Sequence, residues 1–157
     1  MSLEGLNRLK VWVKAKEFAV AIYKKALPSL PPEEKWNLNQ QLRRAALSVP
    51  ANIAEGYGRF YYQDNVRFCY NPRGSLDEVL SHMTIAYEMN YFSAGLYREL
   101  VNQGNEVDRM LNGYIAYLKN SKQGASEPGA NHFSHEESPS QSTESGEDST
   151  EPKDPVL

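Results

Sequence analysis

The sequence contains almost no cysteine and no long apolar run. Cys69 is the only cysteine among 157 residues, so no disulfide can form within the chain, and a reducing cytoplasmic environment is the expectation. No apolar stretch approaches the roughly 20 residues that cross a bilayer. Lys10, Lys14 and Lys16 interrupt any signal-peptide core near the N-terminus. These absences predict a cytoplasmic protein with no membrane partner.

The motifs of common enzymes and cofactor sites are also missing. The chain has no Walker A loop, no Gly-x-Gly-x-x-Gly, no His-Glu-x-x-His, no Cys-x-x-Cys and no Gly-x-Ser-x-Gly. Two of its three histidines, His132 and His135, lie near the C-terminus, apart from His82. Cys69 falls on an apolar seam, which is typical of a small buried side chain. We therefore predict no enzyme, no cofactor and no metal site.

Charge is unevenly divided along the chain. Residues 1–122 contain 16 basic and 12 acidic residues, whereas residues 123–157 contain Lys153 and eight acidic residues, a net charge of -7. The C-terminal part is also rich in Ser, Glu, Pro and Gly, and such a segment cannot bury enough apolar surface to fold. The sequence predicts one domain over residues 1–122 and a disordered acidic tail over residues 123–157. The tail is either a solvated segment or an arm that contacts basic surfaces.

Helical periodicity runs through residues 1–122, and no strand pattern is present. Apolar positions three or four apart predict helices over residues 6–27, 32–57, 61–91 and 93–120. Pro50 lies inside the second helix, where we expect a kink. At Asn71 and Pro72 the third helix either kinks or splits. Short connections between such helices favour an all-α fold, an antiparallel up-and-down four-helix bundle.

Two polar stripes border the apolar seams of the second and third helices. An antiparallel pair with its turn near Gly58 places Arg44 beside Glu78, so we expect an ion pair in a half-buried network. Loss of one partner there would cost on the order of 3 kcal/mol. The network either fixes the helix register or forms a polar surface for RNA or another subunit, and a catalytic role of Glu55 with Glu78 is not supported. Its members, three or four residues apart in each helix, are Gln41, Arg44, Ser48, Asn52, Glu55, Ser75 and Glu78.

A lysine stripe is the second candidate site. Four lysines of the first helix share one arc away from its apolar positions, and aromatic residues 57 and 60–62 flank Arg59. Cations that follow phosphates beside aromatic stacking surfaces are typical of single-stranded RNA binding. The alternative is a solvated lysine face with the aromatics in the core. The candidate RNA-binding residues are Lys10, Lys14, Lys24, Lys25 and Arg59.

Several segments resemble a known family. Residues 41–59 (QLRRAALSVPANIAEGYGR) are similar to the signature of the four-helix-bundle proteins encoded in 23S rRNA intervening sequences. Residues 74–79 (GSLDEV) resemble the second motif of that family, and residues 9–12 (LKVW) and 109–113 (RMLNG) fit its first and last helices. The resemblance covers residues 6–120. The interruption at Asn71-Pro72 and the acidic tail depart from the family pattern.

The resemblance implies a bundle without known enzymatic activity that assembles into a ring-like homopentamer. A related bundle is the accessory protein of diversity-generating retroelements, which binds a reverse transcriptase and RNA. The leading hypothesis is therefore a homo-oligomeric scaffold associated with RNA or a ribonucleoprotein. The alternative is an accessory subunit that binds a reverse transcriptase. We further expect aromatic residues at the subunit contacts, among them Tyr87, Tyr91, Phe92 and Tyr97.

Overall fold

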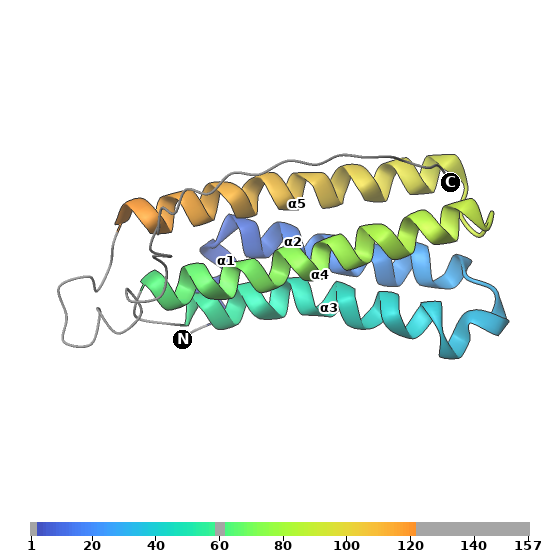
Figure 1. Cartoon of the computed structure of the whole chain (residues 1–157), viewed down its shortest axis with the longest axis horizontal. Coiled ribbons are helices and arrows are strands. Elements are labelled where there is room, and N and C mark those ends of the chain that lie inside the picture. The colour runs from blue at the N-terminus through green and yellow to red at the C-terminus, as the bar shows by residue number, and fades with distance from the viewer. Residues whose placement is uncertain (1–2, 59–61, 122–157) are drawn as a thin grey trace, which may run out of the picture.

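Four long helical segments run alternately up and down in the computed structural model, which describes residues 3–58 and 62–121 (Figure 1). The first segment packs on the second and fourth, and the third packs on the second and fourth, so the helices close around one core. This arrangement is the predicted all-α bundle. Arg59 and the acidic tail lie outside the described residues.

The first segment is less regular than the sequence predicts. It consists of α1 (Leu3–Arg8) and α2 (Lys10–Ala21), which are separated where Leu9 takes an extended conformation with ψ of 98°. A π-helical turn, η1 (Ile22–Ala26), follows, and the Leu27 N–H donates to the Ile22 carbonyl five residues back. A 3-10 turn, η2 (Leu27–Ser29), ends the segment.

The second and third segments continue through their prolines. A 3-10 turn, η3 (Pro32–Trp36), leads into α3 (Leu38–Tyr57), which is unbroken at Pro50. The third segment, α4 (Tyr62–Glu88), is a single helix through Pro72, so it does not split there. The Pro72 side chain is fully buried. Burial of the ring against the core offsets part of the cost of the backbone hydrogen bond that proline cannot make.

Local sequence signals explain how the third helical segment ends and how the fourth begins. Asn90 takes a left-handed conformation (φ 57°), and the Tyr91 N–H donates to the Ala86 carbonyl at 2.9 Å, as at many helix C-termini. The fourth segment, α5 (Ala94–Ser121), begins after Ser93. The Ser93 Oγ accepts a hydrogen bond from the Leu96 N–H at 3.2 Å, which is the predicted N-cap.

The predicted apolar stripes form the core. Phe18, Leu42, Leu76 and Leu111, one from each helical segment, are at most 1% exposed. Between them α5 lies close to its neighbours at Gly104. A Cβ atom there would lie 2.9 Å from Leu80 Cδ2 and 3.3 Å from Phe18 Cζ. The missing side chain of Gly104 thus lets three helices meet.

The aromatic residues expected at subunit contacts have partners within the chain. Tyr87 and Tyr97 stack with ring centroids 4.5 Å apart, and Phe92 is 4% exposed. The Tyr91 hydroxyl donates to Glu34 Oε1 at 3.4 Å. Tyr87, Tyr91 and Tyr97 remain half-buried, so their place at subunit contacts stays a prediction. The large apolar side chains left exposed include Trp36, Leu47, Ile85, Met89 and Tyr117.

Candidate nucleic-acid interface

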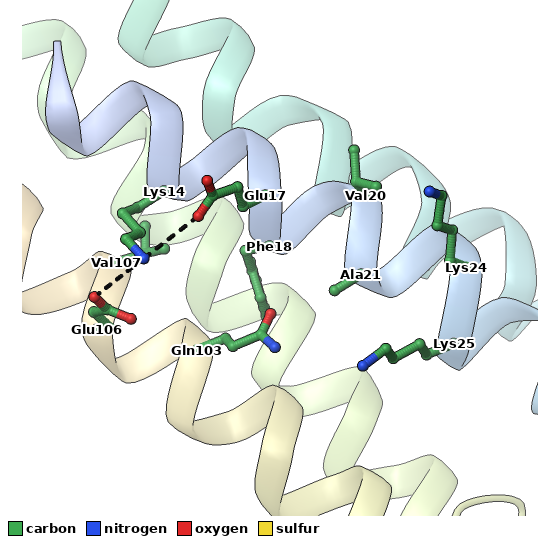
Figure 2. Close-up of a pocket in the computed structure, with 10 residues that line it drawn as sticks. All are labelled: Lys14, Glu17, Phe18, Val20, Ala21, Lys24, Lys25, Gln103, Glu106 and Val107. Carbon is green, nitrogen blue, oxygen red and sulfur yellow. Dashed lines mark ion pairs between the residues drawn. The ribbon is translucent and has the colours of Figure 1, made fainter. Parts of the chain in front are cut away.

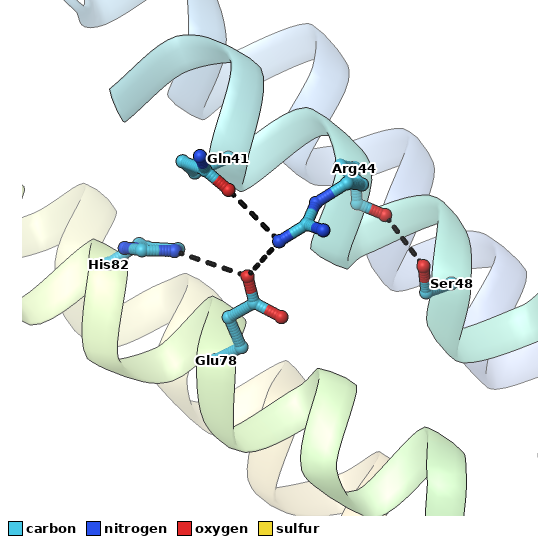
Figure 3. A network of polar contacts seen from close by, with 5 residues as sticks. All are labelled: Gln41, Arg44, Ser48, Glu78 and His82. Atoms are coloured by element: carbon cyan, nitrogen blue, oxygen red, sulfur yellow. Dashed lines mark hydrogen bonds and ion pairs between the residues drawn. The ribbon is translucent and has the colours of Figure 1, made fainter. Parts of the chain in front are cut away.

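An ion pair between α3 and α4 lies at the centre of the polar stripes (Figure 3). Arg44 Nη2 donates to Glu78 Oε1 at 3.0 Å, and also to Gln41 Oε1 at 3.0 Å. The register of the hairpin therefore brings Arg44 to Glu78 as predicted. Farther along α3 the Ser48 hydroxyl donates to the Arg44 carbonyl, and Asn52 Nδ2 donates to the Ser48 carbonyl.

The Arg44–Glu78 pair is less buried than the sequence predicts. The Arg44 side chain is 70% exposed and that of Glu78 is 37% exposed, so water replaces whichever partner is lost. Exposed ion pairs contribute about 1 kcal/mol or less, which corrects the larger cost expected for a buried network. Ser48 and Asn52 bond to their own helix, Glu55 lies exposed near the end of α3, and Ser75 is half-buried one turn before Glu78.

His82 extends the network on α4. Its Nε2 lies 3.6 Å from Glu78 Oε1, and the pair is ionic only when the imidazole is protonated. This nitrogen is buried and has no hydrogen-bond partner among the described residues. The Glu78 carboxylate is thus approached from one side by the Arg44 guanidinium and from the other by the imidazole.

The lysine stripe faces α5 across a groove of about 370 Å³ (Figure 2). Lys14 Nζ lies 3.4 Å from Glu17 Oε2 and 3.6 Å from Glu106 Oε1. The hydrogen bond that Lys14 donates to the Glu17 carboxylate and the charge of Glu106 raise the pKa of Lys14. Lys25 Nζ lies 2.5 Å from Glu99 Oε1. Two of the candidate lysines are therefore already paired with carboxylates, and this face is not a strip of uncompensated positive charge.

The other candidate cations are placed differently. Lys10 and Lys24 are exposed on the first segment, and Lys24 lines the groove. Arg59 falls outside the described residues, as do Phe60 and Tyr61 beside it. The structure thus gathers Lys14, Lys24 and Lys25 at one groove but leaves Lys10 toward the other end of α2.

Positive charge is concentrated in the first half of the bundle. Residues 3–58 contain nine basic and five acidic residues, a net charge of +4. The described second half, residues 62–121, contains five basic and seven acidic residues, a net charge of -2. By net charge alone, the first half is therefore more favourable to a polyanion than the second.

Three close contacts between a cation and an aromatic ring lie in this basic half. Lys16 Nζ is 4.9 Å from the Trp12 ring centroid, and Lys35 Nζ is 4.8 Å from that of Trp36. The Arg43 guanidinium carbon is 4.7 Å from the Tyr23 ring centroid. The Arg43–Tyr23 contact was not predicted from the sequence, because it joins α3 to η1 and only the fold shows that these two elements are neighbours. The sequence offered one signal for this site: two adjacent arginines, Arg43 and Arg44, in a part of α3 without acidic residues.

Cys69 is not a reactive group. Its side chain is fully buried on α4, and burial raises the pKa of the thiol from 9.0 to about 11. The thiolate is therefore scarce at neutral pH. Within residues 3–58 and 62–121, no three His, Cys, Asp or Glu side chains gather where they could hold a metal ion. No described helix is both long and apolar enough to span a membrane.

Comparison with known proteins places this bundle in a family. Residues 7–113, well over half of the chain, match the 23S rRNA-intervening sequence proteins. The chain belongs to this family. The matched region begins before α2, ends within α5 and includes the Arg44–Glu78 pair and the groove of Lys14.

A solved structure agrees with the 23S rRNA-intervening sequence fold. A protein of unknown function from the S23 ribosomal protein family of Bacteroides thetaiotaomicron superposes with a TM-score of 0.62. The two sequences are 24% identical over 67% of this chain and 97% of the other. This likeness supports the fold alone. None of the curated proteins matches the chain.

Proposed function

We propose that this protein is a non-enzymatic, homo-oligomeric bundle that binds RNA and serves as a scaffold in a ribonucleoprotein. The observation that carries the proposal is the net charge of +4 on residues 3–58, together with three cation–ring contacts on the same half. Cations supply the salt-dependent affinity for phosphates, and exposed rings supply stacking surfaces. The name of the family, which refers to an insertion in 23S rRNA, agrees with an RNA partner.

Assembly into a ring of identical subunits, a pentamer by resemblance, is the second part of the proposal. Trp36 is 74% exposed and Tyr117 65%, and aromatic side chains are enriched at protein interfaces. The test is the molar mass from light scattering at micromolar concentration. A cyclic oligomer is expected, and a monomer would refute this part.

RNA binding is tested by a salt titration of the full chain and of a chain lacking residues 123–157. Each phosphate contact releases counterions, so affinity should fall as a power of the salt concentration. The tail carries a net charge of -7 and competes for the same cations, so its deletion should tighten binding. The gain should be largest at low salt, where screening is weakest.

The alternative is an accessory subunit whose main partner is a reverse transcriptase. Ile85 and Met89, one turn apart at the end of α4, are 50% and 55% exposed and offer an apolar contact for another protein. Absence of RNA binding by both chains at about 50 mM salt, where phosphate contacts are strong, would favour this alternative.

A further inference from the structure

A hollow of about 530 Å³ lies on the outer face of the basic half, between η1 and α3. We call it the Tyr23–Arg43 hollow. It is distinct from the groove of Lys14, because it opens on the α3 side of the first segment. No lining residue assigned to it is acidic, whereas Glu17 and Glu106 line the other groove. The residues that line it are Tyr23, Gln40, Gln41, Arg43, Arg44 and Leu47.

Arg43 is the cation best placed to receive an anion here. Its guanidinium lies over the Tyr23 ring at 4.7 Å, which orients the planar group. In the described structure its hydrogen bond to Asn39 Oδ1 is long, at 3.5 Å. A guanidinium has five N–H donors in a fork that matches phosphate oxygens, so most of them remain available. Arg44, in contrast, is engaged by Gln41 and Glu78.

The rest of the hollow suits a nucleobase better than a second phosphate. Leu47 is 53% exposed and offers an apolar surface beside the Tyr23 ring. The exposed amide of Gln40 carries donors and an acceptor that can hydrogen-bond base edges, and Gln41, whose Oε1 accepts from Arg44, adds its amide donors. One turn before Gln40, Trp36 is 74% exposed with Lys35 Nζ over its ring.

Three of these residues form one line along α3. Gln40, Arg43 and Leu47 are three and four residues apart, the spacing of a single helical face, whereas Trp36 ends the preceding 3-10 turn η3. From Gln40 to Leu47 the line spans roughly 10 Å at 1.5 Å per residue. Amide, cationic and apolar groups therefore follow one another on an exposed face of α3.

We infer that the Tyr23–Arg43 hollow binds unpaired nucleotides of RNA, with Arg43 on a phosphate and a base stacked beside Tyr23 and Leu47. The inference rests on the proposed function and locates its contact on α3 rather than on the lysine stripe. Unpaired bases are required, because the bases of an A-form duplex are stacked on each other and cannot reach an aromatic ring.

The test is fluorescence anisotropy of a labelled unstructured RNA of roughly 12 nucleotides, within the usual range of single-strand sites, and of a hairpin of equal length. Arg43→Ala should weaken binding of the single strand roughly tenfold, the loss expected for one charge-assisted contact to a phosphate. It should also reduce the slope of log affinity against log salt concentration by about one, the contribution of one phosphate contact. Arg73→Ala is the matched control, because Arg73 is an exposed arginine near a tyrosine ring, at 6.0 Å, but on α4. It should change affinity by less than about twofold, the effect of one distant surface charge.

The other possible results contradict either the inference or the proposed function, and they can be told apart. Equal affinity of Arg43→Ala and wild type, with a loss on Lys14→Ala, would place RNA at the groove and overturn the inference while RNA binding stands. No binding by wild type would overturn the proposed function itself. A lowered molar mass of Arg43→Ala or Leu47→Ser in light scattering, without loss of RNA affinity, would make the hollow an interface between copies and overturn the inference.

Discussion

Replacement of Gly104 by alanine tests whether the close meeting of three helices limits the stability of the bundle. Alanine adds one Cβ atom, which would lie 2.9 Å from Leu80 Cδ2 and 3.3 Å from Phe18 Cζ. Phe18 is 1% exposed and cannot move outward, so α5 or Leu80 must shift. Overpacking of a well-packed core costs about 1–3 kcal/mol.

A second effect acts in the opposite direction. Alanine is favoured over glycine inside a helix by about 1 kcal/mol. Gly113→Ala separates the two effects, because Gly113 lies in the same helix, is exposed, and has nothing within 4 Å of an added Cβ. It should stabilise the protein by about 1 kcal/mol. Gly104→Ala should be neutral or should destabilise by up to about 2 kcal/mol.

The assay is urea denaturation followed by circular dichroism, with both variants and wild type at one protein concentration. The difference between the two variants isolates the packing penalty, because the helix-propensity gain is common to both. Leu80→Val shortens the facing side chain, so it should reduce the penalty of Gly104→Ala in a double-mutant cycle. Equal stabilisation by Gly104→Ala and Gly113→Ala would refute the close-approach argument.

The remaining predictions concern three other contacts. Arg44→Ala and Glu78→Ala should each cost about 1 kcal/mol or less in urea denaturation, because the pair is exposed; a loss near 3 kcal/mol would mean that the pair is buried, as in an assembly. Cys69 should react with a thiol reagent at pH 8 only after unfolding, and fast labelling of the native chain would contradict its burial. Because the folded pKa of Cys69 is about 11 and its ordinary value is 9.0, its contribution to stability is full below pH 9 and is lost as the pH rises toward 11. Ser93→Ala should cost about 1 kcal/mol through loss of the cap on Leu96, with Ser93→Gly nearer to neutral.

Periodicity predicted the architecture because each helix buries one face. Phe18, Leu42, Leu76 and Leu111 all lie in stripes that the sequence alone identifies. The Arg44–Glu78 pair was also predictable, since a short turn between two helices fixes which positions face each other. The continuity of α4 was not, because the burial of the Pro72 ring depends on how the helices pack together in the fold.

The electrostatics of the lysine stripe could not be predicted from the first helix. A helical wheel shows which lysines share a face, but not which face of another helix lies opposite. Glu99 and Glu106, which pair with Lys25 and Lys14, come from α5, more than 70 residues later. The same limitation hid the contact between Tyr23 and Arg43.

The π-helical turn at Ile22–Ala26 makes this stretch of the first segment tolerant of a one-residue deletion. The Leu27 N–H donates to the Ile22 carbonyl, five residues back, whereas an α-helical hydrogen bond joins residues four apart. The π-helical turn therefore contains one residue more than an α-helical turn. Deletion of the exposed Lys24 would convert the turn to an ordinary α-turn, and the buried positions before and after it would keep their orientation. The same deletion inside α2, at Lys16 for example, would rotate every later core residue by about 100° and expose the apolar face. Among relatives, a single-residue deletion should therefore be tolerated at this turn, while the length of α2 stays constant.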